Sequence, residues 1–313
     1  MRVLVTGGAG YVGTVLAGQL LAQGHRVRCL DNLVHGREPL RALLQDRRFE
    51  LWEGSIEDGP LVRSALQGCA AVIHLAGLAN DGSCDRDPWL ARRINVQAAA
   101  DLAGLARAAG CSRLINASSC SVYGFTDGDA LTEAARPNPV SLYGVLKLEA
   151  EASIDAAAGA DLVVAHLRQA TLFGRSPRMR WDLVVNAMTR DACLRGKIQV
   201  HGGGQQWRPL LHVQDAAAAF ATALTTSPEA LAARVFNVGN SAENYRIADL
   251  AALVREAVPG ARIEHPTGAV ERRSYRVDFG RLGAALDWRP HHTVRQGIAE
   301  LKGPLQMAPA ALR

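Results

Sequence analysis

The feature that most constrains this chain is an apolar strand followed at once by a glycine-rich turn and a helix. Residues 2–6 predict a buried strand, Gly7, Gly10 and Gly13 follow in the spacing G-x-x-G-x-x-G, and residues 14–23 have a helical pattern. One glycine permits the tight turn, one lets the backbone approach a pyrophosphate, and one lets the helix pack closely on the strand. The amide groups and dipole of the helix N-terminus favour phosphate there. The opening of the chain therefore predicts a nucleotide-binding βαβ unit.

An acidic residue after the second predicted strand indicates which dinucleotide fits this unit. Residues 26–30 form that strand, and Asp31 follows it, 18 residues past Gly13. An acid at about this spacing binds the ribose 2′-hydroxyl of NAD and would repel the 2′-phosphate of NADP. We therefore expect NAD as the cofactor. Three glycines alone could form an ordinary strand–helix turn, but the ordered strand, glycines, helix, strand and acid argue against that alternative.

Tyr143 and Lys147 form a Tyr-x-x-x-Lys pair inside a segment with a helical pattern. Their i, i+4 spacing places both side chains on one face of a helix. A phenol has a pKa of about 10, and a nearby ammonium favours the phenolate and lowers that pKa. The pair predicts an acid–base device for moving a proton on a sugar or alcohol oxygen, with a plain surface pair as the alternative.

Strand and helix patterns alternate as far as about residue 166, which predicts an α/β fold. Such an order is typical of a Rossmann-type, doubly wound parallel sheet with helices on both faces and ligands beyond the carboxyl ends of its strands. We expect residues 1–168 to form an NAD-binding Rossmann domain to which residues 213–238 return. Residues 169–212 and 239–313 are expected to form mainly a smaller C-terminal α/β substrate-binding lobe. The further predicted elements are strands at residues 49–53, 71–75, 113–117 and 162–166 and helices at residues 88–109 and 141–158.

The composition of the chain indicates which partners it can bind and in which cellular compartment it is expected. A net charge of +5 suits an anionic ligand, but no lysine-rich run with interleaved aromatic residues is present, so nucleic acid is not expected. Six cysteines show no C-x-x-C pair and no metal-ligand spacing, which favours reduced thiols, a cytoplasmic protein and no metal site. The sequence shows no signal-peptide pattern and no apolar stretch of transmembrane length, so no membrane association is expected.

Several motifs together resemble the extended short-chain dehydrogenase/reductase family, in particular its NAD-dependent nucleotide-sugar epimerases and dehydratases. The resemblance covers nearly the whole chain and is specific for the family rather than for one reaction. Its marks are T-G-G-A-G-Y-V-G at residues 6–13, H-L-A-G at 74–77, Asn95, S-S-C-S-V-Y-G at 118–124, Tyr143 with Lys147, L-R at 167–168, F-G at 173–174, W-R-P at 207–209 and H-V-Q-D at 212–215.

The resemblance implies a role for each matching residue. Tyr143 would be the acid–base group, Lys147 would lower its pKa and bind the nicotinamide ribose, and Ser119 would hydrogen-bond the reacting oxygen. Arg208 and, on a looser match, Arg273 would bind the diphosphate of the substrate. The implied cofactor contacts are Gly7, Gly10, Tyr11, Val12, Gly13, Asp31, Asn32, Ser55, Ile56, Leu75, Ala76, Gly77, Asn95, Ser118, Tyr143 and Lys147. The expected substrate contacts are Ser119, Ser121, Arg208 and Arg273, together with Cys120, for which a small buried residue behind the site is the alternative. From their positions alone, Asn80 after the strand at residues 71–75 and Asn186 on a predicted helix are also expected at the substrate, with a plain loop and a helix position without a ligand as the respective alternatives.

Departures from the family pattern limit which of the family's reactions this chain is expected to catalyse. Gly54-Ser55 stands where the family often has Gly-Asp, whose acid contacts adenine. Cys120 and Ser121 occupy the positions of the Asp-Glu pair in the 4,6-dehydratases, and the sugar-acid decarboxylases usually carry a glutamate at the position of Ser121. Neither cysteine nor serine replaces those acids at neutral pH, so 4,6-dehydration is disfavoured.

The expected function is therefore NAD-dependent epimerisation of a nucleotide-diphosphate sugar, at C4, through a transient 4-keto intermediate. A net NAD-dependent oxidoreductase on the same substrates, either a dehydrogenase or a 4-ketoreductase, is the alternative. A non-enzymatic NAD-binding regulator is a third reading, against which the complete Tyr, Lys and Ser set argues. The alanine-rich helices at residues 88–109 and 141–158 resemble those that pair across a two-fold axis in the family, so we expect a homodimer, although a buried monomeric face has a similar sequence.

Overall fold

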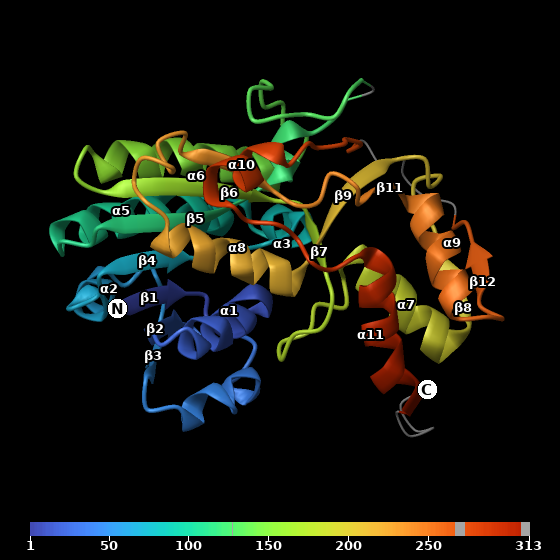
Figure 1. Ribbon diagram of the computed structural model, residues 1–313, viewed down its shortest axis with the longest axis horizontal. Coiled ribbons are helices and arrows are strands. Elements are labelled where there is room, and N and C mark those ends of the chain that lie inside the picture. The colour runs from blue at the N-terminus through green and yellow to red at the C-terminus, as the bar shows by residue number, and fades with distance from the viewer. Residues whose placement is uncertain (127, 267–272, 308–313) are drawn as a thin grey trace.

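A parallel sheet of seven strands lies at the centre of this computed structural model, which describes residues 1–126, 128–266 and 273–307 (Figure 1). All of its strand pairs are parallel, and helices cover both faces, which confirms the predicted Rossmann-type α/β fold. In spatial order the strands are β10 (Val235–Val238), β6 (Val163–Gln169), β5 (Arg113–Ser119), β4 (Ala71–His74), β1 (Arg2–Thr6), β2 (Arg26–Asp31) and β3 (Phe49–Glu53).

The central strand shows why this sequence forms a two-sided sheet. Val3, Leu4 and Val5 of β1 are all completely buried, because successive side chains point to opposite faces and both faces are covered. From β1 the chain first builds β2 and β3 on one side and then crosses over to build β4, β5 and β6 on the other. The strand order thus reverses between β1 and β4, and the carboxyl ends of strands at such a switch point leave room for a ligand.

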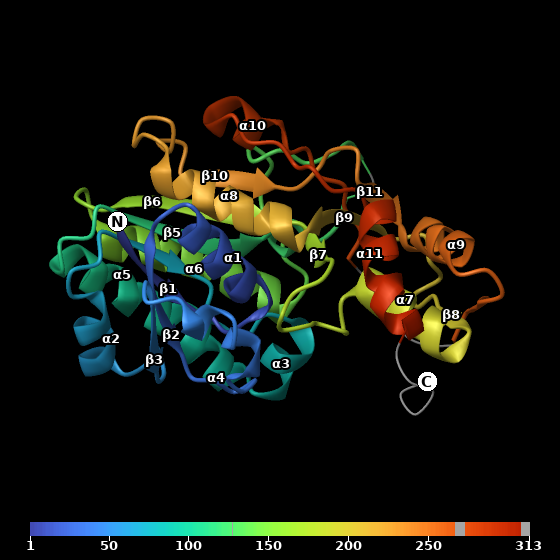
Figure 2. The same cartoon turned by 60° about the horizontal axis from the view of Figure 1, so that its bottom comes forward.

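Helices lie on both faces of the sheet (Figures 1 and 2) and enclose a hydrophobic core on each face. Leu16, Leu20 and Phe220 belong to the core on one face, and Leu102 and Ile154 belong to the core on the other. The first face is covered by α1 (Tyr11–Ala22) and α8 (Val213–Thr225), and the second by α2 (Gly59–Leu66), α5 (Ala98–Ala108) and α6 (Leu142–Ala158). The short elements along these faces are η1 (Glu38–Leu40), η2 (Leu43–Gln45), α3 (Asp81–Arg86) and η4 (Cys120–Tyr123).

The helix predicted at residues 88–109 is interrupted in the structure. It consists of α4 (Pro88–Arg92), a π-helical turn η3 (Arg93–Gln97), and α5. A π-helical turn inserts extra backbone and is frequent near functional sites. Here it carries Asn95, whose Oδ1 accepts a hydrogen bond from the Leu78 amide at 2.8 Å in the loop after β4. The sequence pattern reveals the helix but not this change in its pitch, because the apolar spacing is preserved through it.

A second lobe adjoins the carboxyl ends of the central strands and has a core of its own. Phe173, Val185, Leu250, Val254 and Ile298 are buried together in it. Its helices are α7 (Val184–Arg195), α9 (Ile247–Ala257) and α11 (Val294–Met307). Its strands are β7 (Thr171–Phe173), β9 (Trp207–His212) and β11 (Asn244–Arg246), which form one small sheet, and β8 (Lys197–Gln199) and β12 (Arg262–Glu264), which form another.

Part of the C-terminal third returns to the central sheet. The helix α10 (Gly280–Leu286) lies against β10, and Val277, Phe279 and Leu282 belong to the core that α1 and α8 cover. Residues 267–272 and 308–313 of the expected substrate lobe lie outside the described residues. Within the part of the chain that the structure describes, no helix is both long and apolar enough to span a membrane.

Candidate active site

A cleft of about 840 Å³ lies at the switch point of the sheet, between the turns that follow the central strands and the second lobe. It brings most of the predicted site residues together, although they come from elements far apart in the sequence. Those that line it are Gly7, Gly10, Tyr11, Val12, Gly13, Asp31, Asn32, Ser55, Ile56, Leu75, Ala76, Gly77, Asn80, Ser118, Ser119, Ser121, Tyr143, Lys147, Arg208 and Arg273.

The glycine turn is packed so closely that side chains are excluded at two of its positions. Gly7 has a φ of +73°, and a Cβ on it would lie 2.6 Å from the Ala76 amide nitrogen. A Cβ on Gly13 would lie 2.3 Å from the Gly7 carbonyl oxygen. Gly10 is the N-cap residue of α1 and no side-chain hydrogen bond caps the helix, so backbone amides of its first turn face the cleft. This cradle fits the pyrophosphate of a dinucleotide.

Asp31 is held rigidly at the end of β2. One carboxylate oxygen accepts the Ala9 amide at 2.9 Å, and the other accepts the Leu33 amide at 2.8 Å. The first bond ties the carboxylate directly to the glycine turn, so its position relative to the phosphate cradle is fixed. The carboxylate lines the cleft where a ribose hydroxyl could donate to it.

The proposed proton-transfer group is assembled from α6 and the end of β5. The Ser141 hydroxyl caps α6 by accepting the Gly144 amide at 3.3 Å, which starts the helix that carries Tyr143 and Lys147. The Lys147 ammonium lies 5.8 Å from the centre of the Tyr143 ring and donates to the Ala117 carbonyl at 2.8 Å. Ser119 hydrogen-bonds the Tyr143 side chain from the adjoining strand end.

The electrostatics of this group differ from the expectation that Lys147 lowers the pKa of Tyr143. Burial raises the pKa of Tyr143 to about 12, because the desolvated cleft disfavours the phenolate more than the Ser119 hydrogen bond and the Arg180 charge favour it. Burial likewise lowers the pKa of Lys147 to about 8, against the opposing effects of Cys84 and Glu151. The spacing identified the pair, but the cost of desolvating both groups decides the direction of each shift.

Several polar atoms that line the cleft are buried without a hydrogen-bond partner among the described residues. They are Ser121 Oγ, Gln169 Oε1, Gln206 Oε1 and Asp81 Oδ1. Buried polar groups are nearly always paired, so unpaired atoms on four residues of one cleft are unusual.

Two arginines that were expected to contact phosphate line the cleft from the second lobe. Arg208 Nη1 donates to the Trp207 carbonyl at 2.8 Å and to the Arg273 carbonyl at 2.5 Å. The Arg273 guanidinium forms an ion pair with Asp81 of α3, on the opposite wall. These contacts hold both arginines at the cleft and link its two sides.

Three of the predicted contacts do not line the cleft. Asn95 bonds both the amide and the carbonyl of Leu78 and thereby shapes the loop after β4 from behind. Cys120, the first residue of η4, is 1% exposed, and its thiol donates to the Arg168 carbonyl of the neighbouring strand at 3.1 Å. Asn186 is fully buried and donates to the Tyr11 hydroxyl at 3.2 Å.

Other cleft residues were missed by the sequence analysis. Gln169 ends β6, so the rule that ligands bind beyond the carboxyl ends of parallel strands could have identified it. Arg178 and Arg180 belong to an arginine-rich run after Gly174 whose charge was a usable signal. His35 follows the end of β2 by four residues, so the same rule could have identified it, whereas Gln206 carries no such signal because it belongs to the second lobe.

A buried ion pair supports the site from behind. Arg168 of β6 donates to both carboxylate oxygens of Glu151 of α6, at 2.9 and 2.7 Å. The Ser118 hydroxyl donates to the same carboxylate at 2.5 Å, and Arg168 also donates to the Tyr123 hydroxyl at 3.1 Å. This network fastens the helix that carries Tyr143 to the end of the strand that carries Ser119.

Comparison with known proteins gives consistent matches over the chain. Residues 3–239 match the model of the family described as the NAD dependent epimerase/dehydratase family. The UDP-glucose 4-epimerase of Mycolicibacterium smegmatis is 32% identical over 308 residues, which cover 96% of this chain and 97% of that protein. The UDP-glucuronic acid decarboxylase 1 of Arabidopsis thaliana is 30% identical over 96% of this chain and 69% of its own length.

Solved structures agree with these matches. MoeE5 in complex with UDP-glucose and NAD has a TM-score of 0.82 and 28% identity, over 96% of this chain and 97% of that one. The UDP-glucose 4-epimerase of Thermotoga maritima with UDP-glucose has a TM-score of 0.84 and 25% identity, over 96% of this chain and 97% of that one.

Proposed function

The chain belongs to the NAD-dependent epimerase/dehydratase family, and from this premise we propose that it interconverts C4 epimers of a nucleotide-diphosphate sugar, with NAD as cofactor. One observation carries the proposal. Tyr143, Lys147 and Ser119 line the same cleft as the glycine turn and Asp31. A proton-transfer group and a dinucleotide cradle therefore face one shared space. The related UDP-glucose 4-epimerases and the UDP-glucose complex of MoeE5 favour a UDP-sugar as substrate.

The residues of the cradle fit NAD. Backbone at Gly10 would approach the pyrophosphate, Asp31 would accept the adenosine ribose hydroxyls, and Lys147 would donate to the nicotinamide ribose. When bound there, NAD supplies reversible hydride acceptance from C4 of the sugar. The lack of net oxidation in an epimerisation requires that the same cofactor molecule stays in place between the two half-reactions.

The chain's own residues would handle the proton. Tyr143 removes the proton of the 4-hydroxyl group and later returns it, while Ser119 hydrogen-bonds the same oxygen as its charge changes. Only the phenolate of Tyr143 can accept that proton, and burial, which raises the pKa of Tyr143 to about 12, opposes this form. The cations Lys147 and Arg180 line the cleft beside it and favour the phenolate when the proton moves. Epimerisation at C4 needs no further acid or base, which suits Cys120 and Ser121 in place of carboxylates.

A substrate panel tests this function directly. Purified protein would be incubated with UDP-, GDP-, ADP-, CDP- and dTDP-hexoses, and the products read by NMR, with the NAD content of the protein measured beforehand. We expect protein-bound NAD and a C4-epimer equilibrium for at least one UDP-sugar, without accumulation of NADH. Stoichiometric NADH formation would instead favour the net oxidoreductase, and loss of carbon dioxide would favour a decarboxylase.

Replacing Arg208 tests the binding of the diphosphate. Arg208→Ala is expected to raise KM for the nucleotide sugar by about 10- to 100-fold with a smaller change in kcat, because charged hydrogen bonds to the remote end of the substrate are lost. Arg255→Ala, on the exposed side of α9, is the matched control and should leave KM unchanged. Because Arg208 also holds two carbonyl groups, thermal unfolding of both variants separates lost binding from lost folding. An unchanged KM in folded Arg208→Ala would refute the phosphate contact.

We also propose a cytoplasmic homodimer. Six unpaired thiols among the described residues suit a reducing compartment. On α5 and α6, which pack against each other, the small residues Gly104, Ala152 and Ala156 remain accessible to solvent. Small residues let helices approach closely, so this face could pair with its copy across a two-fold axis. Light scattering that gives the mass of a single 33.4 kDa chain would contradict the dimer.

A further inference from the structure

We propose that residues 174–183, which join β7 to α7, form a fixed clasp over the cofactor cleft and that Arg178, with His35, holds the adenosine end of the dinucleotide there. The inference rests on NAD occupying the cleft, as in the proposed function. It goes further by assigning the rate of cofactor release to residues of the second lobe. The glycine turn and Asp31 bind from the side of the sheet only, whereas the clasp would close over them.

The start of the clasp is attached to the helix of the glycine turn. The Tyr11 hydroxyl donates to the Gly174 carbonyl at 2.6 Å. The Ser176 hydroxyl donates to the Tyr11 carbonyl at 2.7 Å and contacts the Thr14 hydroxyl at 3.0 Å. Tyr11 and Thr14 belong to α1, whose N-terminus faces the cleft. The clasp therefore has a defined position relative to the phosphate cradle.

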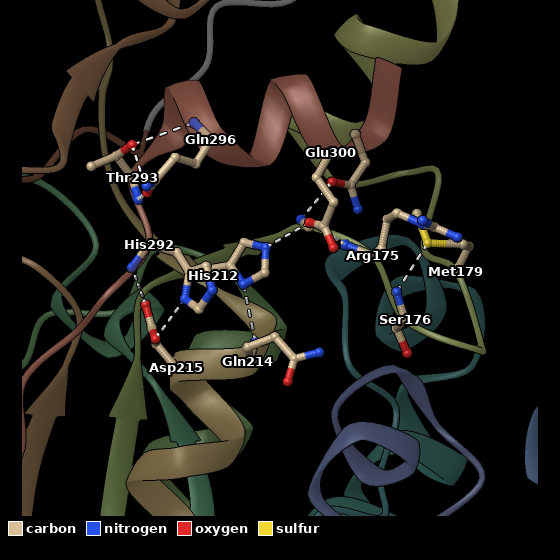
Figure 3. A network of polar contacts seen from close by, with 12 residues as sticks. Arg175, Ser176, Met179, His212, Gln214, Asp215, His292, Thr293, Gln296 and Glu300 are labelled. Carbon is tan, nitrogen blue, oxygen red and sulfur yellow. Dashed lines mark hydrogen bonds and ion pairs between the residues drawn. The ribbon is translucent and has the colours of Figure 1, made fainter. Parts of the chain in front are cut away.

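The second lobe holds the same residues from the other side (Figure 3). Glu300 of α11 accepts the Arg175 amide at 3.2 Å and bonds the His212 ring at 2.9 Å. Gly174 packs so tightly on that ring that a Cβ would lie 2.2 Å from its Nε2 atom. Asn186 accepts the Gly174 amide at 3.0 Å and donates to the Arg180 carbonyl at 2.9 Å. With both ends fixed in this way, the clasp is formed in advance of binding.

The middle of the clasp reaches the adenosine end of the cleft. Arg178 Nη2 lies 2.8 Å from the His35 ring, and both residues line the cleft together with Asp31. Burial and then the Arg178 charge lower the pKa of His35, so its ring is neutral at neutral pH and accepts a hydrogen bond from Arg178. The guanidinium carries five N–H groups, and its other bond among the described residues is to the Met179 carbonyl. Donors therefore remain for ribose or phosphate oxygens opposite Asp31.

A second contact crosses the cleft near its other end. Arg180 Nη1 donates to the Ala79 carbonyl at 3.3 Å, in the loop after β4. Asp182 pairs with the same guanidinium and keeps it in this orientation. The clasp thus touches the sheet side both near Asp31 and near Ala79. A dinucleotide lying between these contacts cannot leave until at least one of them opens.

The rate of NAD release tests the clasp without measuring catalysis. Holoprotein, loaded with NAD by incubation if necessary, would be diluted, passed through gel filtration at timed intervals, and assayed for the NAD that stays bound. Arg178→Ala is expected to release NAD about tenfold faster or more, because a charged contact is lost. Arg178→Lys should fall between Arg178→Ala and the wild type. Arg175→Ala is the control, because that exposed side chain lies in the same segment but outside the cleft lining.

Each outcome decides a separate question. Release from Arg178→Ala within twofold of the wild type, in protein with an unchanged unfolding temperature, would overturn the clasp. Faster release from Arg175→Ala to the same extent would also overturn it, because a general loosening of the segment would then be the cause. If Arg178→Ala loses NAD rapidly while no nucleotide sugar is turned over by the wild type, the clasp stands and the proposed function fails. If the wild type epimerises a nucleotide sugar while Arg178→Ala releases NAD at the wild-type rate, the proposed function stands and the clasp fails.

Discussion

Tyr143→Phe is expected to lower kcat by about 10²- to 10⁴-fold, which is the usual contribution of a positioned acid–base group. The substitution keeps the aromatic ring and removes only the hydroxyl that would exchange a proton with the sugar. NAD should remain bound, because the glycine turn and Asp31 are untouched. Steady-state kinetics together with the NAD content of the purified variant would measure both effects.

A matched tyrosine separates the chemistry from a general loss of hydroxyl groups. Tyr245→Phe changes a half-buried tyrosine of β11 that does not line the cleft, so its kcat should stay at the wild-type value. A Tyr143→Phe variant that retains kcat would remove Tyr143 from the proton transfer. A variant that loses both activity and NAD would instead assign Tyr143 to cofactor binding alone.

Breaking the buried ion pair behind the site is expected to have the largest effect on stability. Glu151→Ala should lower the free energy of unfolding by about 3–5 kcal/mol, because it leaves the Arg168 charge buried without its carboxylate partner. Burial disfavours the charge on Arg168, yet the bonds from Glu151 outweigh this effect and raise the pKa of Arg168. Denaturant titration followed by both fluorescence and circular dichroism would measure the change.

An exposed ion pair on the same helix provides the control. Glu149 pairs with Arg92 at the surface, with side chains 36% and 54% exposed, so Glu149→Ala should cost no more than about 1 kcal/mol. The double variant Glu151→Leu with Arg168→Met removes both charges and should recover part of the loss. Equal destabilisation by Glu149→Ala and Glu151→Ala would contradict this explanation, because we expect the two effects to differ only through the burial of the Glu151 pair.

The fold followed from local patterns that the structure retains. The strands predicted at residues 2–6 and 49–53 have the same bounds in β1 and β3. The continuous apolar run of β1 fits a strand that is buried on both faces. The helix at residues 88–109 was predicted without its π-helical turn, because the spacing of the apolar residues is nearly the same on both sides of that turn. Part of the C-terminal segment packs on the central sheet rather than in the second lobe, which periodicity alone does not indicate.

The candidate site was predictable to the extent that its residues adjoin strand ends. Asp31, Ser119 and Gly77 each follow a predicted parallel strand, and all three line the cleft. Cys120 and Ser121 were both named as substrate contacts; Ser121 lines the cleft, whereas Cys120 is buried behind it, as the alternative for this residue held. Asn186 was expected at the substrate and instead supports Tyr11 and the clasp. The sequence predicted that Asn186 lies on a helix, but it did not predict that its side chain contacts Tyr11 and Gly174.

What the sequence determined by itself was the βαβ opening, the acid at residue 31 and the Tyr-x-x-x-Lys spacing, because each depends on contacts within a few turns or on adjacent strands. Only the tertiary structure decided that Arg178 meets His35, although 143 residues separate them. It also decided that burial raises the pKa of Tyr143. Both results depend on how the two lobes close around the cleft, and the water that this closure excludes is a property of the packed molecule rather than of any local pattern.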